Sequence, residues 1–188
     1  SLNENFKKRI KPGTVNVITT NPPFGTKIDD TRDYVLEKYE LGHKLIDGEP
    51  TKELVDGQDP DKLFVERDIL YLKDATDSEE GGRMVIVLPK QNLSGAQEES
   101  VEFRKWLLKK VQITAIVDLP REAFQPHTGT KTSLVFLKKV KNIPEDYPIF
   151  MAVSEAVGHD RRGNPLYKKD ASGMNLLGDD GKEVIWND

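Results

Sequence analysis

A continuously apolar run, Met84 to Leu88, lies between Gly82 and Pro89. A strand with one solvated face alternates apolar and polar side chains, whereas this run contains no polar position. Such a run is typical of a strand that is covered on both faces, as in a parallel sheet. The chain is therefore expected to build a layered α/β domain around this segment.

Other short apolar or β-branched runs repeat this pattern, and segments with helical spacing lie among them. The expected strands are 15–20, 84–88, 113–117, 132–137 and 149–153, and the expected helices are 61–74 and 98–110. This alternation predicts βαβ units and a largely parallel sheet. The loop 119–131 is too short for a crossover helix, so the strand after it is expected to be antiparallel.

Three segments fall outside this alternation. Residues 5–11, which include a basic run, are expected to end a helix before Pro12. Residues 25–60 are polar and rich in turn residues, which predicts a long functional or disordered loop. A turn near 160–165 is expected to join a hairpin of residues 151–158 and 166–169, followed by a tail.

The sharpest chemical motif, Asn21-Pro22-Pro23-Phe24, directly follows the first expected strand, and ligands of open α/β sheets bind beyond carboxyl ends of strands. The side-chain carbonyl of Asn21 and the backbone carbonyl of Pro22 can accept both hydrogens of an exocyclic amino group. The lone pair of that nitrogen would then turn toward an electrophile. The prolines restrict the backbone, and Phe24 offers a face for a base extruded from a duplex. The structural alternative is a plain turn that ends the strand.

This motif belongs to a series of segments that resembles the N6-adenine DNA methyltransferases, especially the modification subunits of type I restriction-modification systems. The segments are NPPFG at 21–25, GGRMVIVLP at 81–89, IVDLP at 116–120 and FQPHTGTKTSLVFL at 124–137. The resemblance implies the C-terminal half of a Rossmann-like S-adenosylmethionine-dependent methyltransferase fold, a mixed sheet with an antiparallel last strand. Asn21, Pro22, Pro23 and Phe24 would then be the catalytic residues that hold and present the adenine.

The same resemblance implies substrate contacts just before the last strand. Phe124 would lie against the flipped base, and Thr128, Gly129, Lys131 and Thr132 would touch the target strand of double-stranded DNA. A buried structural role for Phe124 and loop-forming roles for the other four are the alternatives. Sequence choice would come from a separate specificity subunit, and a restriction subunit would complete the system.

The family's cofactor loop is a Phe-x-Gly-x-Gly segment after an earlier strand, and no Gly-x-Gly occurs in these 188 residues. The cofactor-binding residues are therefore unknown, and we expect the chain to be a fragment. Residues 1–158 would be a partial methyltransferase catalytic domain, and 159–188 a hairpin turn and C-terminal tail. S-adenosylmethionine would serve the full-length enzyme, whereas the isolated chain is expected neither to bind it nor to methylate DNA. An exposed sheet edge would favour self-association.

The net charge of −4 is unevenly distributed, since residues 29–80 hold 17 acidic and seven basic residues. The segments with the motifs are net positive, so the charge does not exclude DNA binding. The chain has no cysteine, and its three histidines lack metal-ligand spacing, so no metal site is expected. It shows no signal peptide and no apolar run long enough for a membrane span, which predicts a cytoplasmic protein.

Two alternative functions stay open on the sequence. An RNA or protein-glutamine amino-methyltransferase would keep the chemistry and change the substrate, although the long pattern at 119–137 argues against it. A non-catalytic module would only bind DNA or a partner subunit.

Overall fold

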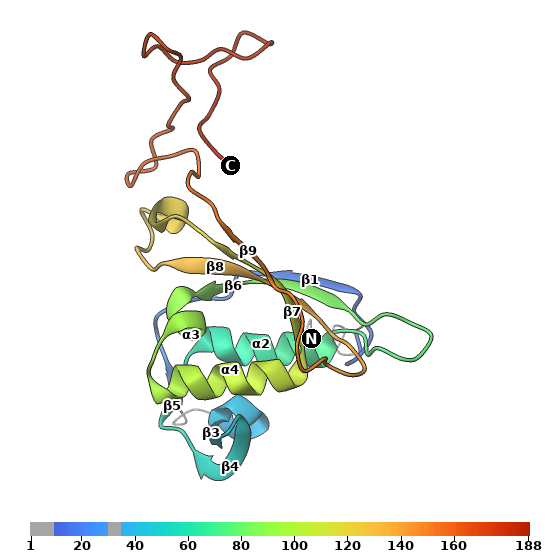
Figure 1. Cartoon of the computed structure of the whole chain (residues 1–188). Coiled ribbons are helices and arrows are strands. Elements are labelled where there is room, and N and C mark those ends of the chain that lie inside the picture. Colours follow the sequence, from blue (N-terminus) through green and yellow to red (C-terminus); the bar gives the residue numbers. More distant parts are fainter. Residues whose placement is uncertain (1–9, 30–34) are drawn as a thin grey trace.

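The computed structural model describes residues 10–29 and 35–188, so the predicted helix end at 5–11 lies mostly outside the described part. Its centre is a five-stranded sheet in the order β1-β6-β8-β7-β9 (Figure 1). The strands are β1 (Val17–Thr20), β6 (Arg83–Pro89), β7 (Gln112–Asp118), β8 (Thr132–Lys138) and β9 (Phe150–Val153).

Strand direction confirms the predicted mixed sheet. The strand β6 runs parallel to β1, and β9 runs parallel to β7. The strand β8 is antiparallel to both of its neighbours, β6 and β7, as the short loop before it predicts. All the other strands of the sheet therefore point the same way, and their carboxyl ends share one edge.

Helices α2 (Pro60–Tyr71) and α4 (Glu98–Lys110), with the short α3 (Lys90–Ser94), lie on one face of the sheet (Figure 1). The helix α2 ends earlier than predicted because Val15 pairs with the chain after it, and the N–H of Lys73 donates to the carbonyl of Val15 at 2.8 Å. The largest fully buried side chains are Trp106, Phe103, Leu36, Leu41, Leu72, Met84, Ile86, Leu88, Leu107 and Leu137. On the opposite face, Val85 and Phe136 are only half-buried.

The polar segment 25–60 is not the long loop that its composition predicts. Its described part contains β2 (Ile28–Asp29) paired with β5 (Gly57–Gln58), β3 (His43–Ile46) paired with β4 (Glu49–Leu54), and the 3₁₀ turns η1 (Leu36–Lys38) and η2 (Glu40–Gly42). Leu36 and Leu41 are fully buried in the core. The carboxylate of Glu66 on α2 accepts the backbone N–H groups of Glu40 and Leu41 at 2.8 and 2.9 Å. These contacts bridge about 25 residues, so local composition does not reveal them.

The end of the chain forms a projecting arm, which we call the C-terminal arm (residues 155–188; Figure 1). The predicted turn near 160–165 is confirmed, because His159 pairs with Pro165 and the N–H of Leu166 donates to the carbonyl of Gly158 at 2.9 Å. The predicted hairpin is wrong beyond this turn, because Phe150–Val153 form β9 and pair with β7. The predicted tail instead folds back along the arm. Its bridges join Val157 to Asn187, Tyr167 to Ile185, Lys169 to Asn175 and Leu177 to Glu183.

The Asp68 side chain on α2 makes stability depend on pH. Burial raises the pKa of this carboxyl from 3.8 to about 6, although nearby Arg67 lowers it. Because the folded state binds the proton more tightly, stability falls as pH rises from about 4 to about 6 and stays lower above that range. Asp68→Asn should therefore raise the free energy of unfolding at pH 8, by at most about 3 kcal/mol, and flatten its pH dependence.

Urea unfolding at pH 5 and pH 8 measures this effect. Asp179→Asn, at an exposed position of the C-terminal arm, is the matched control and should leave both free energies of unfolding unchanged. An Asp68→Asn protein with the same pH dependence as the unaltered chain would contradict the prediction.

Candidate active site

The predicted motif lies at the edge of the sheet where the parallel strands end. Asn21 follows β1, Lys90 follows β6, and Asp118 ends β7. The antiparallel β8 begins at the same edge, with Thr132 opposite Pro89 in β6. This edge is where open α/β sheets bind ligands, so the topology supports the predicted location of the site.

The four residues of the motif 21–24 differ in how far they are exposed to solvent. Pro22 is buried and anchors the turn, whereas Asn21 and Pro23 are exposed and Phe24 is half-buried. The side-chain amide of Asn21 is thus accessible to a ligand, and two consecutive prolines hold the backbone around it. Gly25 follows with φ +107°, a conformation that favours glycine, so the chain turns sharply away after Phe24.

The structure brings Phe24 and Phe124 together, although 99 residues separate them along the chain. Their ring centroids lie 6.1 Å apart with an interplanar angle of 76°, an edge-to-face arrangement. Both rings are half-buried, so each keeps surface that a ligand can reach. From the sequence, both aromatic residues were predicted to contact the same flipped base. In the structure their side chains are neighbours.

The loop that carries Phe124 holds its own shape. It begins with the 3₁₀ turn η3 (Arg121–Phe124), and the N–H of Thr128 donates to the carbonyl of Phe124 at 3.0 Å. The Thr128 hydroxyl accepts the N–H of Thr130 at 3.2 Å, and Arg121 Nε donates to the carbonyl of Gly129 at 3.4 Å. Thr128 therefore forms hydrogen bonds within the loop. This is the loop-forming role that the sequence left as the alternative to a DNA contact.

The remaining predicted substrate residues differ in accessibility. Gly129 and Lys131 are exposed, and so can meet a ligand. Thr132 is only 1% exposed, and its hydroxyl has no hydrogen-bond partner among the described residues. Four of the five predicted substrate residues thus lie in the loop before β8 and Thr132 begins that strand, and Lys131 is the one charged residue among the five.

Sequence reasoning missed a polar network at the same edge. Lys90 Nζ donates to Asp118 Oδ2, and the Ser133 hydroxyl donates to Asp118 Oδ1 at 2.6 Å. The bonds from Lys90 and Ser133 hold the pKa of the Asp118 carboxyl below its usual value. This network ties together the ends of β6, β7 and β8. The only sequence signal was that Lys90 and Asp118 each stand at a strand end next to a proline-containing turn.

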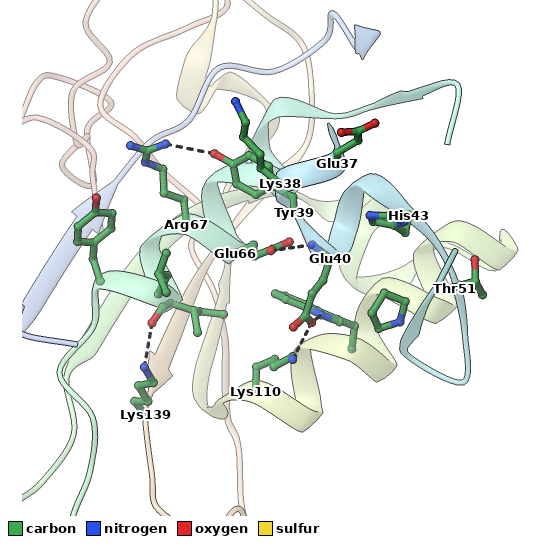
Figure 2. A pocket seen from close by; sticks show the side chains of 15 residues that line it. Glu37, Lys38, Tyr39, Glu40, His43, Thr51, Glu66, Arg67, Lys110 and Lys139 are labelled. Atoms are coloured by element: carbon green, nitrogen blue, oxygen red, sulfur yellow. Dashed lines mark hydrogen bonds and ion pairs between the residues drawn. The ribbon is translucent and has the colours of Figure 1, made fainter. Parts of the chain in front are cut away.

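A cavity of about 810 Å³ lies away from these residues, between helices α2 and α4 and the segment 37–51 (Figure 2). Its polar groups are largely engaged with one another. Glu40 Oε2 accepts Trp106 Nε1 at 2.7 Å and pairs with Lys110 at 2.6 Å, and Arg67 donates to the Tyr39 hydroxyl at 3.2 Å. This network attaches the segment to the helices and contains none of the predicted site residues.

The paired glycines Gly81 and Gly82 do not form a cradle for the predicted cofactor. Gly81 and Gly82 precede β6, at the sheet edge opposite the motif. A Cβ at these positions would lie 2.1 Å from the carbonyl oxygen of Lys139 and 2.6 Å from that of Val15. These glycines therefore permit close packing of the backbone and are not open to a ligand.

Two further predictions concern metals and membranes. Over residues 10–29 and 35–188, no three metal-ligating side chains gather in one place. In the same ranges, no helix has the length and apolar character needed to cross a membrane.

The fold is shared with methyltransferases of known structure. A Listeria monocytogenes protein described as a class I S-adenosylmethionine-dependent methyltransferase is 19% identical, with a TM-score of 0.55 over 77% of this chain and 38% of its own. A Vibrio vulnificus protein described as the modification subunit of a type I restriction enzyme is 20% identical, with a TM-score of 0.54 over 93% of this chain and 37% of its own. At these identities the likeness concerns the fold alone.

The profile of the N-6 DNA methylase family matches residues 1–176, and the chain belongs to this family. It is also 33% identical over 125 residues to the methylase subunit of the type I restriction enzyme EcoEI of Escherichia coli. The match covers 66% of this chain and 21% of that relative, so the chain spans about a fifth of the relative's length. The family that the motif order predicts is thereby confirmed.

Proposed function

We propose that this chain presents adenine for N6 methylation in DNA, with S-adenosylmethionine as methyl donor. The carrying observation is the edge-to-face pair of Phe24 and Phe124 beside the exposed amide of Asn21 at the carboxyl edge of the sheet. Membership of the N-6 DNA methylase family supports the same reaction. Gly81 and Gly82 are packed against backbone and do not form a cofactor cradle, so the part that we assign to this chain is to bind and orient the base.

The chemistry follows from the residue types. The adenine amino nitrogen is a poor nucleophile because its lone pair is delocalised into the ring. The side-chain oxygen of Asn21 and the backbone oxygen of Pro22 would accept its two hydrogens and direct the lone pair toward the methyl group. The base must first leave the duplex, and Phe24 and Phe124 would replace part of the lost stacking, roughly 1–3 kcal/mol per base.

The proposal extends to the surrounding system. A Vibrio vulnificus neighbour is described as a modification subunit, and the Escherichia coli relative as a methylase subunit, of type I restriction enzymes. We infer that this chain acts in the cytoplasm on double-stranded DNA, within an assembly that includes a specificity subunit and a restriction subunit. The specificity subunit would select the sequence, because base-edge contacts define a site and phosphate contacts only position the protein.

A methylation assay tests the substrate class. The complete gene product, combined with the specificity subunit of its system, is given labelled S-adenosylmethionine and, in separate reactions, double-stranded DNA, RNA or a protein mixture. We expect label in DNA only, and nucleoside analysis should identify N6-methyladenine. Label in RNA or in protein glutamine, without label in DNA, would contradict the proposal.

A further inference from the structure

The first turn of the C-terminal arm, residues 160–164, is closed by hydrogen bonds and displays two arginines. The carboxylate of Asp160 accepts the N–H groups of Arg162 and Asn164 at 2.8 and 2.9 Å, and the Asn164 side-chain amide at 3.0 Å. Gly163 takes φ +84°, which the tight turn requires. The turn therefore presents Arg161 and Arg162 at a fixed place on the surface.

This turn sits against the loop that carries Phe124. Arg161 Nε lies 3.6 Å from Glu122 Oε1, and a Cβ on Gly163 would lie 3.9 Å from Pro126 Cδ. A cavity of about 280 Å³ between the two segments is lined by Pro120 and Glu122 of the loop and by several arm residues, Leu166 and Trp186 among them. The arginine turn thus contacts the loop that carries Phe124 of the candidate active site.

Charge is polarised along the C-terminal arm. Residues 155–169 contain four basic and two acidic residues, whereas 170–188 contain one basic and five acidic residues. Of the two acidic residues in the first part, Glu155 is exposed and Asp160 accepts N–H groups of its own turn. Arg162 is exposed, and no described carboxylate lies within ion-pair distance of it. The part of the arm beside the site is therefore suited to bind a polyanion.

We propose that the turn 160–164 binds the phosphate backbone of the DNA that flanks the adenine at the candidate site, with Arg162 as the main contact and Arg161 beside it. This inference rests on the proposed function, since it needs DNA at the site. Arginine is the side chain that best matches phosphate oxygens, through two parallel N–H donors. The contact positions the duplex and carries no sequence information.

The test compares the complete gene product, assembled with its specificity subunit, with its Arg161→Ala/Arg162→Ala variant. Each phosphate contact contributes about 0.9 to the slope of log affinity against log salt, so the double variant should lose roughly 1–2 from that slope. At 0.1 M salt this corresponds to about tenfold weaker DNA binding per lost contact. The KM for DNA should rise while kcat stays unchanged.

Two further variants control for general effects. Lys182→Ala removes the one basic residue of the distal part of the arm and should leave affinity, salt slope and KM unchanged. Arg162→Lys keeps the charge, so with Arg161 intact it should retain the wild-type salt slope. Equal melting temperatures for all variants would show that the arm still folds, because the substituted side chains are exposed.

The outcomes separate this inference from the proposed function. Wild-type protein that forms N6-methyladenine, together with a double variant of unchanged salt slope and KM, overturns the arginine contact and leaves the proposed function standing. Loss of the specificity subunit from the double variant, with intrinsic DNA affinity unchanged, also overturns it and identifies the turn as a protein-docking element. Wild-type protein that does not methylate DNA contradicts the proposed function itself, whatever the salt slope.

Discussion

Replacing Asn21 by alanine should lower the rate constant for DNA methylation by roughly 10²–10³-fold, the cost of removing one preorganised polar group from a developing charge. Without the Asn21 oxygen, only the Pro22 carbonyl would accept a hydrogen of the adenine amino group. The side chain is exposed, so the free energy of unfolding should change by less than about 0.5 kcal/mol. Single-turnover methylation by the complete gene product with its specificity subunit measures the chemical step directly.

The matched control is Asn142→Ala, at an exposed asparagine in the loop after β8. It should methylate DNA at the wild-type rate. DNA binding should survive in the Asn21→Ala protein, since the proposed loss lies in the reaction and phosphate contacts stay intact. An Asn21→Ala protein with an unchanged single-turnover rate would show that this amide does not act on the amino group.

Replacing Trp106 by alanine should lower the free energy of unfolding by about 3–5 kcal/mol, the usual cost of deleting a large aromatic side chain from a core. Trp106 is 1% exposed and stacks on Phe103 with ring centroids 6.3 Å apart. Its Nε1 donates to Glu40 at 2.7 Å, which attaches the segment of η1 and η2 to α4. The substitution therefore opens a cavity and also releases that segment. Urea unfolding followed by circular dichroism measures the loss.

Two further variants test whether the loss comes from the buried position of Trp106 and its bond to Glu40. Trp186→Ala, at the other tryptophan, removes a side chain that is 49% exposed and should cost less than about 1 kcal/mol. Trp106→Phe keeps most of the packing but loses the bond to Glu40, and should cost about 1–3 kcal/mol. Equal destabilisation by the two tryptophan-to-alanine substitutions would contradict the assignment of Trp106 to the core.

The central strands and helices were predictable because local order carries their signal. The apolar run Met84–Leu88 lies within β6, and the amphipathic spacing over 98–110 matches α4. The short connection 119–131 even predicted the direction of β8. In each case the structure follows from side-chain periodicity or from the length of a connection. Both can be read within about a dozen residues.

The segment 35–58 and the C-terminal arm were not predictable in this way. Polar composition suggested a loop, yet Leu36 and Leu41 are buried and Glu66 binds the backbone of Glu40. The arm likewise pairs residues far apart, such as Val157 with Asn187. These structures depend on partners that lie outside any local window, so composition alone misassigned them.

The sequence by itself determined the chemical groups of this protein: the carbonyl acceptors of Asn21 and Pro22, the rings of Phe24 and Phe124, and the order of motifs that indicates its family. Residue type and local order suffice for these conclusions. Only the tertiary structure decided that the centroids of the two rings lie 6.1 Å apart and that the arginine turn of the arm lies beside the loop of Phe124. Such proximity follows from strand order and burial across the whole chain, which bring distant segments to one sheet edge.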